Sequence, residues 1–330
     1  MPRQPRLDTS GALHHVMGRG IDGIKIFRSK NDRADFLNRL AILSEKEALS
    51  IFAWALMDNH FHLLVRTGKL PLSDSMRKLL TGYVVNYNRR HKRNGHLFQN
   101  RYKSILCEDD PYLLELTRYI HLNPLRAGIV ENTNELRRSE RCGHSAIVGT
   151  IKRAWQDRET ILAYFGKRRK PAIEKYEQFV EDGIKAGERP DLVGGGLIRS
   201  LGGWSQVLSL KRAGGKIFSD ERILGSSDFV KNAIKYAEEK EKETLRLNQK
   251  ICDLESLAGK ICKGEGVNIS DLCSGIRKKD VVKSRRIFCQ IAVKKMGYSG
   301  AEIARFIGIT TSAVNRLAVS DEVSDFDKYL

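Results

Sequence analysis

Two histidines, His60 and His62, flank Phe61 at the start of an apolar run that ends near Val65. Side chains alternate between the two faces of a strand, so both imidazoles are expected on one face and the apolar side chains on the other. Two neighbouring imidazoles can share one divalent cation. The alternative is a pair of surface histidines on a half-exposed strand, and the spacing alone leaves both interpretations open.

A tyrosine and an asparagine, Tyr119 and Asn123, lie four positions apart and therefore share one face of a predicted helix. The carboxamide oxygen is a hard ligand that could complete a site with two imidazoles and leave room for a phosphate oxygen and water. Tyr119 would then lie beside the bound phosphate. Alternatively, Tyr119 continues the stripe of Tyr112 and Leu116 into the core, and Asn123 only ends the helix before Pro124.

The elements that must position these residues follow from hydrophobic spacing. The spacing predicts strands at 12–17, 51–56, 61–65 and 102–107, and helices at 31–43, 72–87 and 110–123. The second and third strands are separated by Asp58 and Asn59 and indicate a β-hairpin, and Pro124 is expected to stop the third helix. Strands interleaved with helices predict an α+β fold, with an antiparallel sheet, helices on one face and a free working surface on the other.

The net charge of +18 and the pI near 9.7 favour a polyanionic partner, most simply nucleic acid. The six cysteines include no C-x-x-C pair, which indicates reduced thiols rather than a zinc ribbon or a disulfide framework. No apolar signal segment follows the N-terminus, and no run of 18 apolar residues occurs, so we expect a cytoplasmic protein.

The densest basic stretch between the two candidate motifs is the segment 86–96. Its cations could contact phosphates, and the neighbouring rings could stack on unpaired bases. The predicted phosphate contacts are Arg89, Arg90, Lys92, Arg93, Arg101 and Lys103, and the predicted stacking rings are Tyr87, Phe98 and Tyr102. The arginines at 89 and 90 could also contact the stem of a DNA hairpin. The alternative is a solvated basic turn.

A second pattern, near the C-terminus, indicates a helix-turn-helix at about 280–319. A basic helix over 281–296 precedes two short helices, and Ala304, Gly308 and Val314 have the spacing that close packing and a left-handed turn require. The predicted major-groove contacts are Ser312, Asn315 and Arg316. A plain helical cap would show a similar pattern.

Three motifs together resemble the REP-associated tyrosine transposases, which belong to the HUH single-tyrosine superfamily of insertion-sequence transposases. The motifs are MDNHFHLL at 57–64, GHLFQNRYK at 95–103 and RYIHLNPLRAG at 118–128, and they occur in this order within about 130 residues. The C-terminal pattern is similar to the DNA-binding domain of the replication initiator DnaA. The family resemblance covers somewhat over a third of the chain.

The resemblance implies a ferredoxin-like fold and cleavage of single-stranded DNA with Mg²⁺ or Mn²⁺. His60 and His62 match the HUH pair, Tyr119 the nucleophile and Asn123 the third metal ligand. Attack by the phenol would give a 5′-phosphotyrosine and a free 3′-OH, and the retained phosphoester would let a 3′-OH rejoin strands without ATP. The expected partners are hairpin DNA and, through the helix-turn-helix, duplex DNA, bound by a monomer or a homodimer.

The expected organisation is a catalytic domain over 1–130, a helical and loop-rich connecting region over 131–225, and a helical DNA-binding domain over 226–330. Two other functions fit the same residues. One is a DNA-binding regulator whose catalytic domain serves only for recognition. The other is a metal-dependent nuclease that uses water and leaves Tyr119 a structural role.

Overall fold

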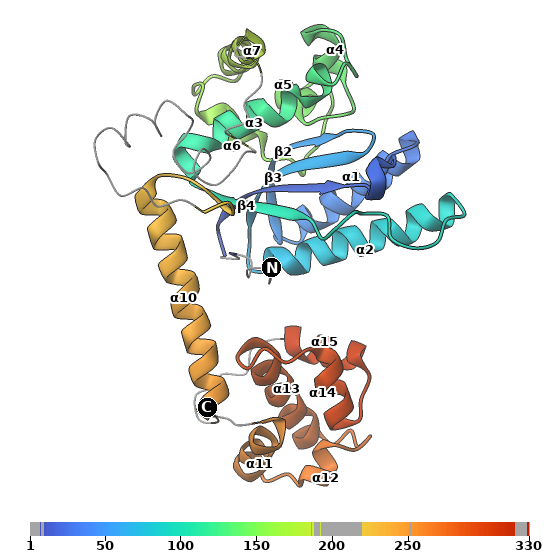
Figure 1. The fold of residues 1–330 in the computed structure, drawn as a ribbon, viewed down its shortest axis with the longest axis vertical. Coiled ribbons are helices and arrows are strands. Elements are labelled where there is room, and N and C mark those ends of the chain that lie inside the picture. Colours follow the sequence, from blue (N-terminus) through green and yellow to red (C-terminus); the bar gives the residue numbers. More distant parts are fainter. Residues whose placement is uncertain are drawn as a thin grey trace. The chain divides into compact units, whose positions relative to one another are not determined.

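The computed structural model describes residues 7, 10–185, 187, 192, 220–250, 253–320 and 329 (Figure 1). The chain divides into two compact units, Met1–Ala233 and Ile234–Leu330. The structure thus groups the described part of the expected connecting region with the catalytic domain, because its helices share a core with the sheet.

The first unit is built on one sheet. Among the described residues its strands are β1 (Leu13–Arg19), β2 (Leu49–Leu56), β3 (His60–Thr67), β4 (Lys103–Cys107) and β5 (Ile223–Leu224). They are ordered β2-β3-β1-β4-β5, with antiparallel pairing among the first four and β5 parallel to β4. Helix α1 (Lys30–Glu45) connects β1 to β2, and α2 (Leu72–Arg90) connects β3 to β4. This βαββαβ order confirms the predicted ferredoxin-like α+β fold.

Helices α1 and α2 cover one face of the sheet (Figure 1). Phe61 of β3 packs there against Phe36, and Phe36 also contacts Tyr83 of α2. Helix α1 begins one position earlier than predicted, because Ser29 and Asp32 form a reciprocal capping box that satisfies the first backbone N–H groups. A short 3-10 helix, η1 (Ile21–Gly23), follows β1.

The opposite face is covered as well, contrary to the expectation of a free surface. Helix α3 (Asp109–Arg126) packs on it through Leu116 and Ile120, which share a buried cluster with Phe52 and Leu64. The same side holds α4 (Thr133–Arg138), α5 (His144–Val148), α6 (Arg158–Ala163) and α7 (Arg169–Lys185). The crossover helices therefore lie on one face as predicted, and the other face is packed against α3 instead of being free.

Helix α3 does not stop before Pro124, which lies inside it. A proline lacks the N–H that would bond to the carbonyl four residues earlier, here that of Ile120. The side-chain amide of Asn123 donates to this carbonyl at 3.4 Å and to the carbonyl of Tyr119 at 3.0 Å. The missing backbone bond is thereby replaced, and the helix continues to Arg126.

A buried cluster of three rings ties α3 to its neighbours. The Tyr176 hydroxyl of α7 lies 2.7 Å from Nδ1 of His121 and 3.1 Å from Nδ1 of His144. A hydroxyl can donate to one imidazole and accept from the other, so the Tyr176 hydroxyl can serve the Nδ1 atoms of both rings. Burial lowers the pKa of His121 well below its usual value and, with Arg137 nearby, lowers the pKa of His144 to about 4.

We expect this cluster to make the first unit sensitive to acid. The lowered pKa means that unfolded His144 binds a proton more readily than folded His144. Its contribution is therefore complete above about pH 6.5 and lost as the pH falls towards 4, by about 3 kcal/mol. Urea unfolding followed by tryptophan fluorescence measures this unit, since all three tryptophans precede residue 234. A His144→Leu variant should be less stable at pH 7 and show a flatter pH dependence. An unchanged dependence would contradict the assignment.

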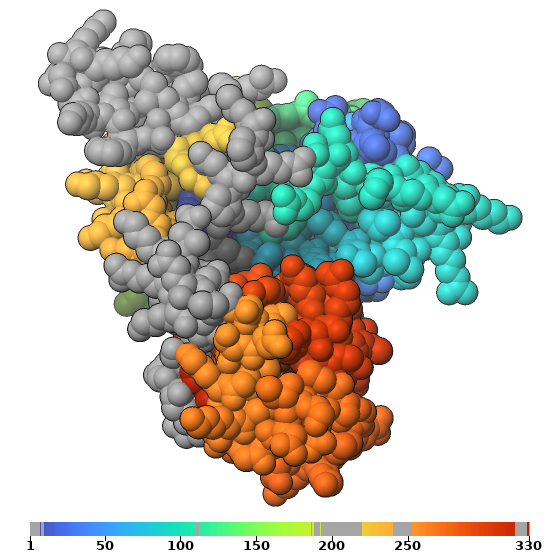
Figure 2. All heavy atoms as spheres, turned by 60° about the horizontal axis from the view of Figure 1, so that its bottom comes forward, coloured from blue at the N-terminus to red at the C-terminus, as the bar shows by residue number. Residues whose placement is uncertain are grey.

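The second unit is helical (orange to red in Figure 2). Helix α10 (Ser227–Lys250) begins in the first unit, and α11 (Leu254–Glu265), α12 (Ile269–Leu272), α13 (Lys279–Lys294), α14 (Gly300–Ile307) and α15 (Thr311–Val319) follow. Gly308 ends α14 with φ of +69°, a conformation that favours glycine, and Val314 is fully buried. These helices lie where the helix-turn-helix pattern predicts them, and the DNA-binding role of the pair stays a prediction.

Two further sequence expectations concern the described residues as a whole. No described helix combines the length and the apolar character needed to cross a membrane. The cysteines at 107, 142, 262, 273 and 289 are all free thiols, and Cys252 lies outside the described residues.

Candidate active site

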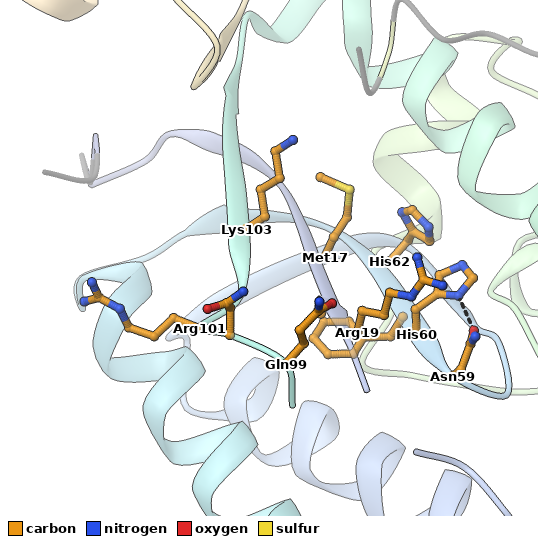
Figure 3. A pocket seen from close by; sticks show the side chains of 11 residues that line it. Met17, Arg19, Asn59, His60, His62, Gln99, Arg101 and Lys103 are labelled. Atoms are coloured by element: carbon orange, nitrogen blue, oxygen red, sulfur yellow. Dashed lines mark hydrogen bonds between the residues drawn. The ribbon is translucent and has the colours of Figure 1, made fainter. Parts of the chain in front are cut away.

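The side chains of His60 and His62 lie on the face of the sheet that α3 covers, and His62 contacts Tyr119 of this helix. Within the sheet, His62 pairs with Met17 of β1, and Met17 pairs with Lys103 of β4 on its other side. His60 pairs with Arg19. Paired residues point to the same face, so these side chains converge on one surface. They line a pocket of about 380 Å³ together with Gly18, Asn59, Phe61, Gln99, Asn100 and Arg101 (Figure 3).

The two imidazoles are arranged so that each can offer its Nε2 atom to one cation. Their ring centroids lie 5.2 Å apart, with an interplanar angle of 81°. If two imidazoles bind one cation through bonds of about 2.1 Å, and the two bonds meet at about a right angle, the ring centroids lie roughly 5 Å apart. Nδ1 of His60 donates to Oδ1 of Asn59 at 2.7 Å, and Nδ1 of His62 lies 3.0 Å from Nε2 of His15. In both rings Nε2 is left as the candidate ligand.

The electrostatics of the site keep both rings neutral. Burial lowers the pKa of His62 well below 6.5, and the neighbouring His15 and His60 add to this effect. Burial and the positive charge of Arg19 lower the pKa of His60 as well. A neutral imidazole has the lone pair that a metal ion needs. The donor set therefore fits a divalent cation, whose remaining positions phosphate and water oxygens can occupy.

Tyr119 on α3 contacts two histidines of the sheet, on the face that α3 covers. Its ring centroid lies 6.0 Å from that of His62 and 6.1 Å from that of His15, both edge to face. The ring is partly buried and packs against the core below α3, so the packing interpretation is correct for part of its surface. Its contact with His62 places it beside the pocket as well.

A cation accompanies this tyrosine. The guanidinium of Arg126 lies 5.5 Å from the centroid of the Tyr119 ring and donates to the carbonyl of Gly187 at 2.9 Å. This contact places a positive charge against the ring of the tyrosine.

The third predicted ligand, Asn123, lies one turn after Tyr119 on α3. The contacts described above commit its amide nitrogen to the helix backbone and leave Oδ1 as the atom for a cation. Among the described residues, no group of three or more histidine, cysteine, aspartate and glutamate side chains could hold a metal ion. Any cation here would thus depend on the two imidazoles and on neutral or phosphate oxygens.

The basic residues separate into those that reach the pocket and those that do not. Arg101 and Lys103 line it, as does Arg19, which sequence reasoning did not single out. Only the pairing of β1 with β3 could have identified Arg19. Arg90 instead forms ion pairs with Asp32 and Asp35 and fastens α2 to α1.

The remaining predicted DNA contacts lie apart from the histidines. Arg89 and Lys92 are exposed at the end of α2, and Arg93 donates to the carbonyl of His96 at 2.8 Å. On α15 of the second unit, the predicted groove contacts Ser312, Asn315 and Arg316 are all exposed.

The prediction that bases stack on Tyr87, Phe98 and Tyr102 is wrong for the two tyrosines. Tyr87 is fully buried, Tyr102 is 8% exposed, and Phe98 packs against the same cluster beneath the sheet. The hydroxyl of Tyr87 donates to the carbonyl of Lys25 at 2.6 Å. Tyr87 and Tyr102 belong to the core and offer no open face to unpaired bases, whereas Phe98 is half-buried.

Comparisons with known proteins identify the segment that contains this site. Residues 10–123 match the family model described as "Transposase IS200 like". A solved structure titled "Structure of the REP associates tyrosine transposase bound to a REP hairpin" is similar over 46% of this chain and 89% of its own, at 13% identity and a TM-score of 0.35. No curated protein gives a significant match. Residues 10–123, which carry this site, are therefore similar to the IS200-like transposases.

Proposed function

We propose that the protein cleaves and rejoins single-stranded, hairpin-forming DNA through a covalent bond between Tyr119 and a 5′-phosphate. The observation that carries the proposal is the edge-to-face contact of Tyr119 with His62, with ring centroids 6.0 Å apart, beside a pocket lined by cations. The hairpin substrate follows from the resemblance of the three sequence motifs to REP-associated transposases. Tyr119 contacts His62 of its own chain, so the proposed active site is built within one protomer.

In the proposed reaction, the Tyr119 oxygen attacks the scissile phosphorus and the bond from phosphorus to the 3′-oxygen breaks. The phenol loses its proton and the departing oxygen gains one, which leaves a 5′-phosphotyrosine and a free 3′-OH. Arg126 helps to hold the attacking residue through its contact with the ring. The phosphotyrosine keeps a phosphoester, so attack by another 3′-OH reverses the step and joins strands without an external energy source.

The proposed cofactor is Mg²⁺ or Mn²⁺, held by Nε2 of His60, Nε2 of His62 and Oδ1 of Asn123. When bound, such a cation polarises the scissile phosphate and offsets the charge that develops on its oxygens. The hydrogen bonds at Nδ1 support this assignment, because they orient both imidazoles before a cation arrives.

The proposed DNA path uses cations in two places. Arg19, Arg101 and Lys103 contact phosphates in the pocket, whereas Arg89, Lys92 and Arg93 contact the hairpin stem. Arg90 is left out, because two carboxylates already share its charge. Duplex DNA is the proposed partner of α15, through Ser312, Asn315 and Arg316.

A Lys103→Gln variant is expected to weaken binding of single-stranded DNA and to flatten its salt dependence. Each phosphate contact on a single strand contributes about 0.7 to the slope of log affinity against log salt, so the slope should fall by about that amount. Titrations at several salt concentrations measure it. Lys152→Gln removes one exposed charge outside the pocket and is the matched control. Equal slopes for the two variants would contradict the proposed phosphate contact.

The proposed function is tested with a labelled hairpin oligonucleotide incubated with the protein and Mn²⁺. A protein–DNA adduct that survives denaturation supports the proposal. Cleavage without an adduct would instead indicate a nuclease that uses water, and binding without cleavage would indicate a regulator.

A further inference from the structure

A third histidine, His15, belongs to the histidine site although it does not reach the pocket. It lies on β1 with its side chain fully buried, and it pairs with Leu64, two positions beyond His62 on β3. This diagonal position across the strands brings the two rings together. They stack with centroids 5.2 Å apart and an interplanar angle of 28°, and Nε2 of His15 lies 3.0 Å from Nδ1 of His62.

The direction of this hydrogen bond decides whether His62 can bind a cation. If His15 donates, Nδ1 of His62 is the acceptor, and the proton of the neutral His62 ring must lie on Nε2. The nitrogen proposed as ligand then has no lone pair to offer. If His62 donates from Nδ1, its Nε2 is free of a proton and His15 accepts through its own Nε2. Asn59 has the same function for His60, since its Oδ1 can only accept.

The position of His15 also fixes the ring of His62 with respect to the nucleophile. His15 contacts the Tyr119 ring edge to face, with centroids 6.1 Å apart, while His62 contacts the same ring at 6.0 Å. The three rings therefore support one another. A rotation of the His62 ring would break both its stacking on His15 and its contact with Tyr119.

We propose that His15 is a positioning residue that accepts a hydrogen bond from Nδ1–H of His62 and so holds His62 in the tautomer and orientation that binds the cation through Nε2. The inference rests on the proposed metal-binding role of His62. His15 itself touches neither cation nor DNA. Partners of this kind typically contribute 10- to 100-fold to metal affinity.

Three variants of the full chain separate positioning from packing. The side-chain amide of glutamine reaches about as far as Nε2 of histidine, whereas that of asparagine reaches only as far as Nδ1. His15→Gln can therefore keep the hydrogen bond to His62, and His15→Asn and His15→Leu cannot. Mn²⁺ affinity is measured by electron paramagnetic resonance of the free ion, and thermal unfolding shows whether each variant is folded.

We expect His15→Leu and His15→Asn to weaken Mn²⁺ binding by about 10- to 100-fold and His15→Gln to stay within about threefold of the unmodified protein. Leucine or asparagine variants with unchanged affinity would overturn the proposal. So would a folded glutamine variant that loses as much affinity as the leucine variant, because the effect would then come from packing.

A second measurement needs no metal, and so distinguishes failure of this inference from failure of the proposed function. Nitrogen-15 chemical shifts of the His62 ring in the metal-free protein report which nitrogen carries the proton. We expect the proton on Nδ1 in the unmodified protein and in His15→Gln, and a mixture of tautomers in His15→Leu. A proton on Nε2 of His62 in the unmodified protein would overturn the proposal whether or not Mn²⁺ binds.

Discussion

Replacing Tyr119 by phenylalanine is expected to abolish the covalent protein–DNA adduct and to lower strand cleavage by a factor on the order of 10³ or more. The substitution removes only the hydroxyl that would attack phosphorus. The ring keeps its contacts with His15, His62 and Arg126, so the helix and the pocket should stay in place. Hairpin affinity and Mn²⁺ affinity should both remain within about twofold of the unmodified protein. A denaturing gel of the labelled oligonucleotide measures the adduct, and titrations measure the two affinities.

The matched control is Tyr112→Phe, which removes a hydroxyl two turns earlier on the same helix. This variant should form the adduct at the normal rate. An adduct formed by Tyr119→Phe would show that another residue is the nucleophile. Cleavage that persists without an adduct would assign the chemistry to a water molecule.

Replacing His62 by alanine is expected to weaken Mn²⁺ binding at least 100-fold and to remove adduct formation at limiting Mn²⁺. The loss of Mn²⁺ affinity should exceed the 10- to 100-fold that residues hydrogen-bonded to a ligand contribute. The change removes a proposed ligand together with its hydrogen bond to His15. His60→Ala should behave similarly. Both affinities can be compared with that of His96→Ala, which removes an exposed imidazole outside the pocket and should bind Mn²⁺ normally.

A mixture of two inactive variants tests whether one chain builds the site. Tyr119 contacts His62 of its own chain, so Tyr119→Phe mixed with His62→Ala should not recover the adduct. Recovery would mean that the tyrosine of one protomer reaches the histidines of another. Normal Mn²⁺ affinity in His62→Ala would contradict the proposed ligand itself.

The local features of the first unit could be predicted because they depend on neighbours in sequence. Side chains along a strand point alternately to its two faces, and this geometry alone placed both imidazoles of 60–65 on one face of β3. The hairpin and the interleaved helices predicted an α+β fold with an antiparallel sheet for the same reason, whereas the ferredoxin-like order was implied by the family resemblance.

The errors occur where an outcome depends on residues that are distant in sequence. Aromatic and basic side chains between 87 and 102 have the composition of a nucleic-acid surface, but Tyr87 and Tyr102 fill the core and Arg90 pairs with Asp32. Pro124 was expected to stop α3, and the side chain of Asn123 compensates for its missing N–H. Each outcome depends on which partners the fold provides.

The sequence by itself determined which residues can do chemistry: a histidine pair on one strand face, and a tyrosine and an asparagine on one helix face. These follow from the repeat of the backbone, which any strand or helix has before it packs. Tertiary structure alone decided that Tyr119 contacts His62, that Arg19 and Lys103 line the same pocket, and that His15 hydrogen-bonds to His62. The register of β1 between β3 and β4 and the docking of α3 set these contacts, and both depend on burying apolar side chains from segments that lie far apart in the chain.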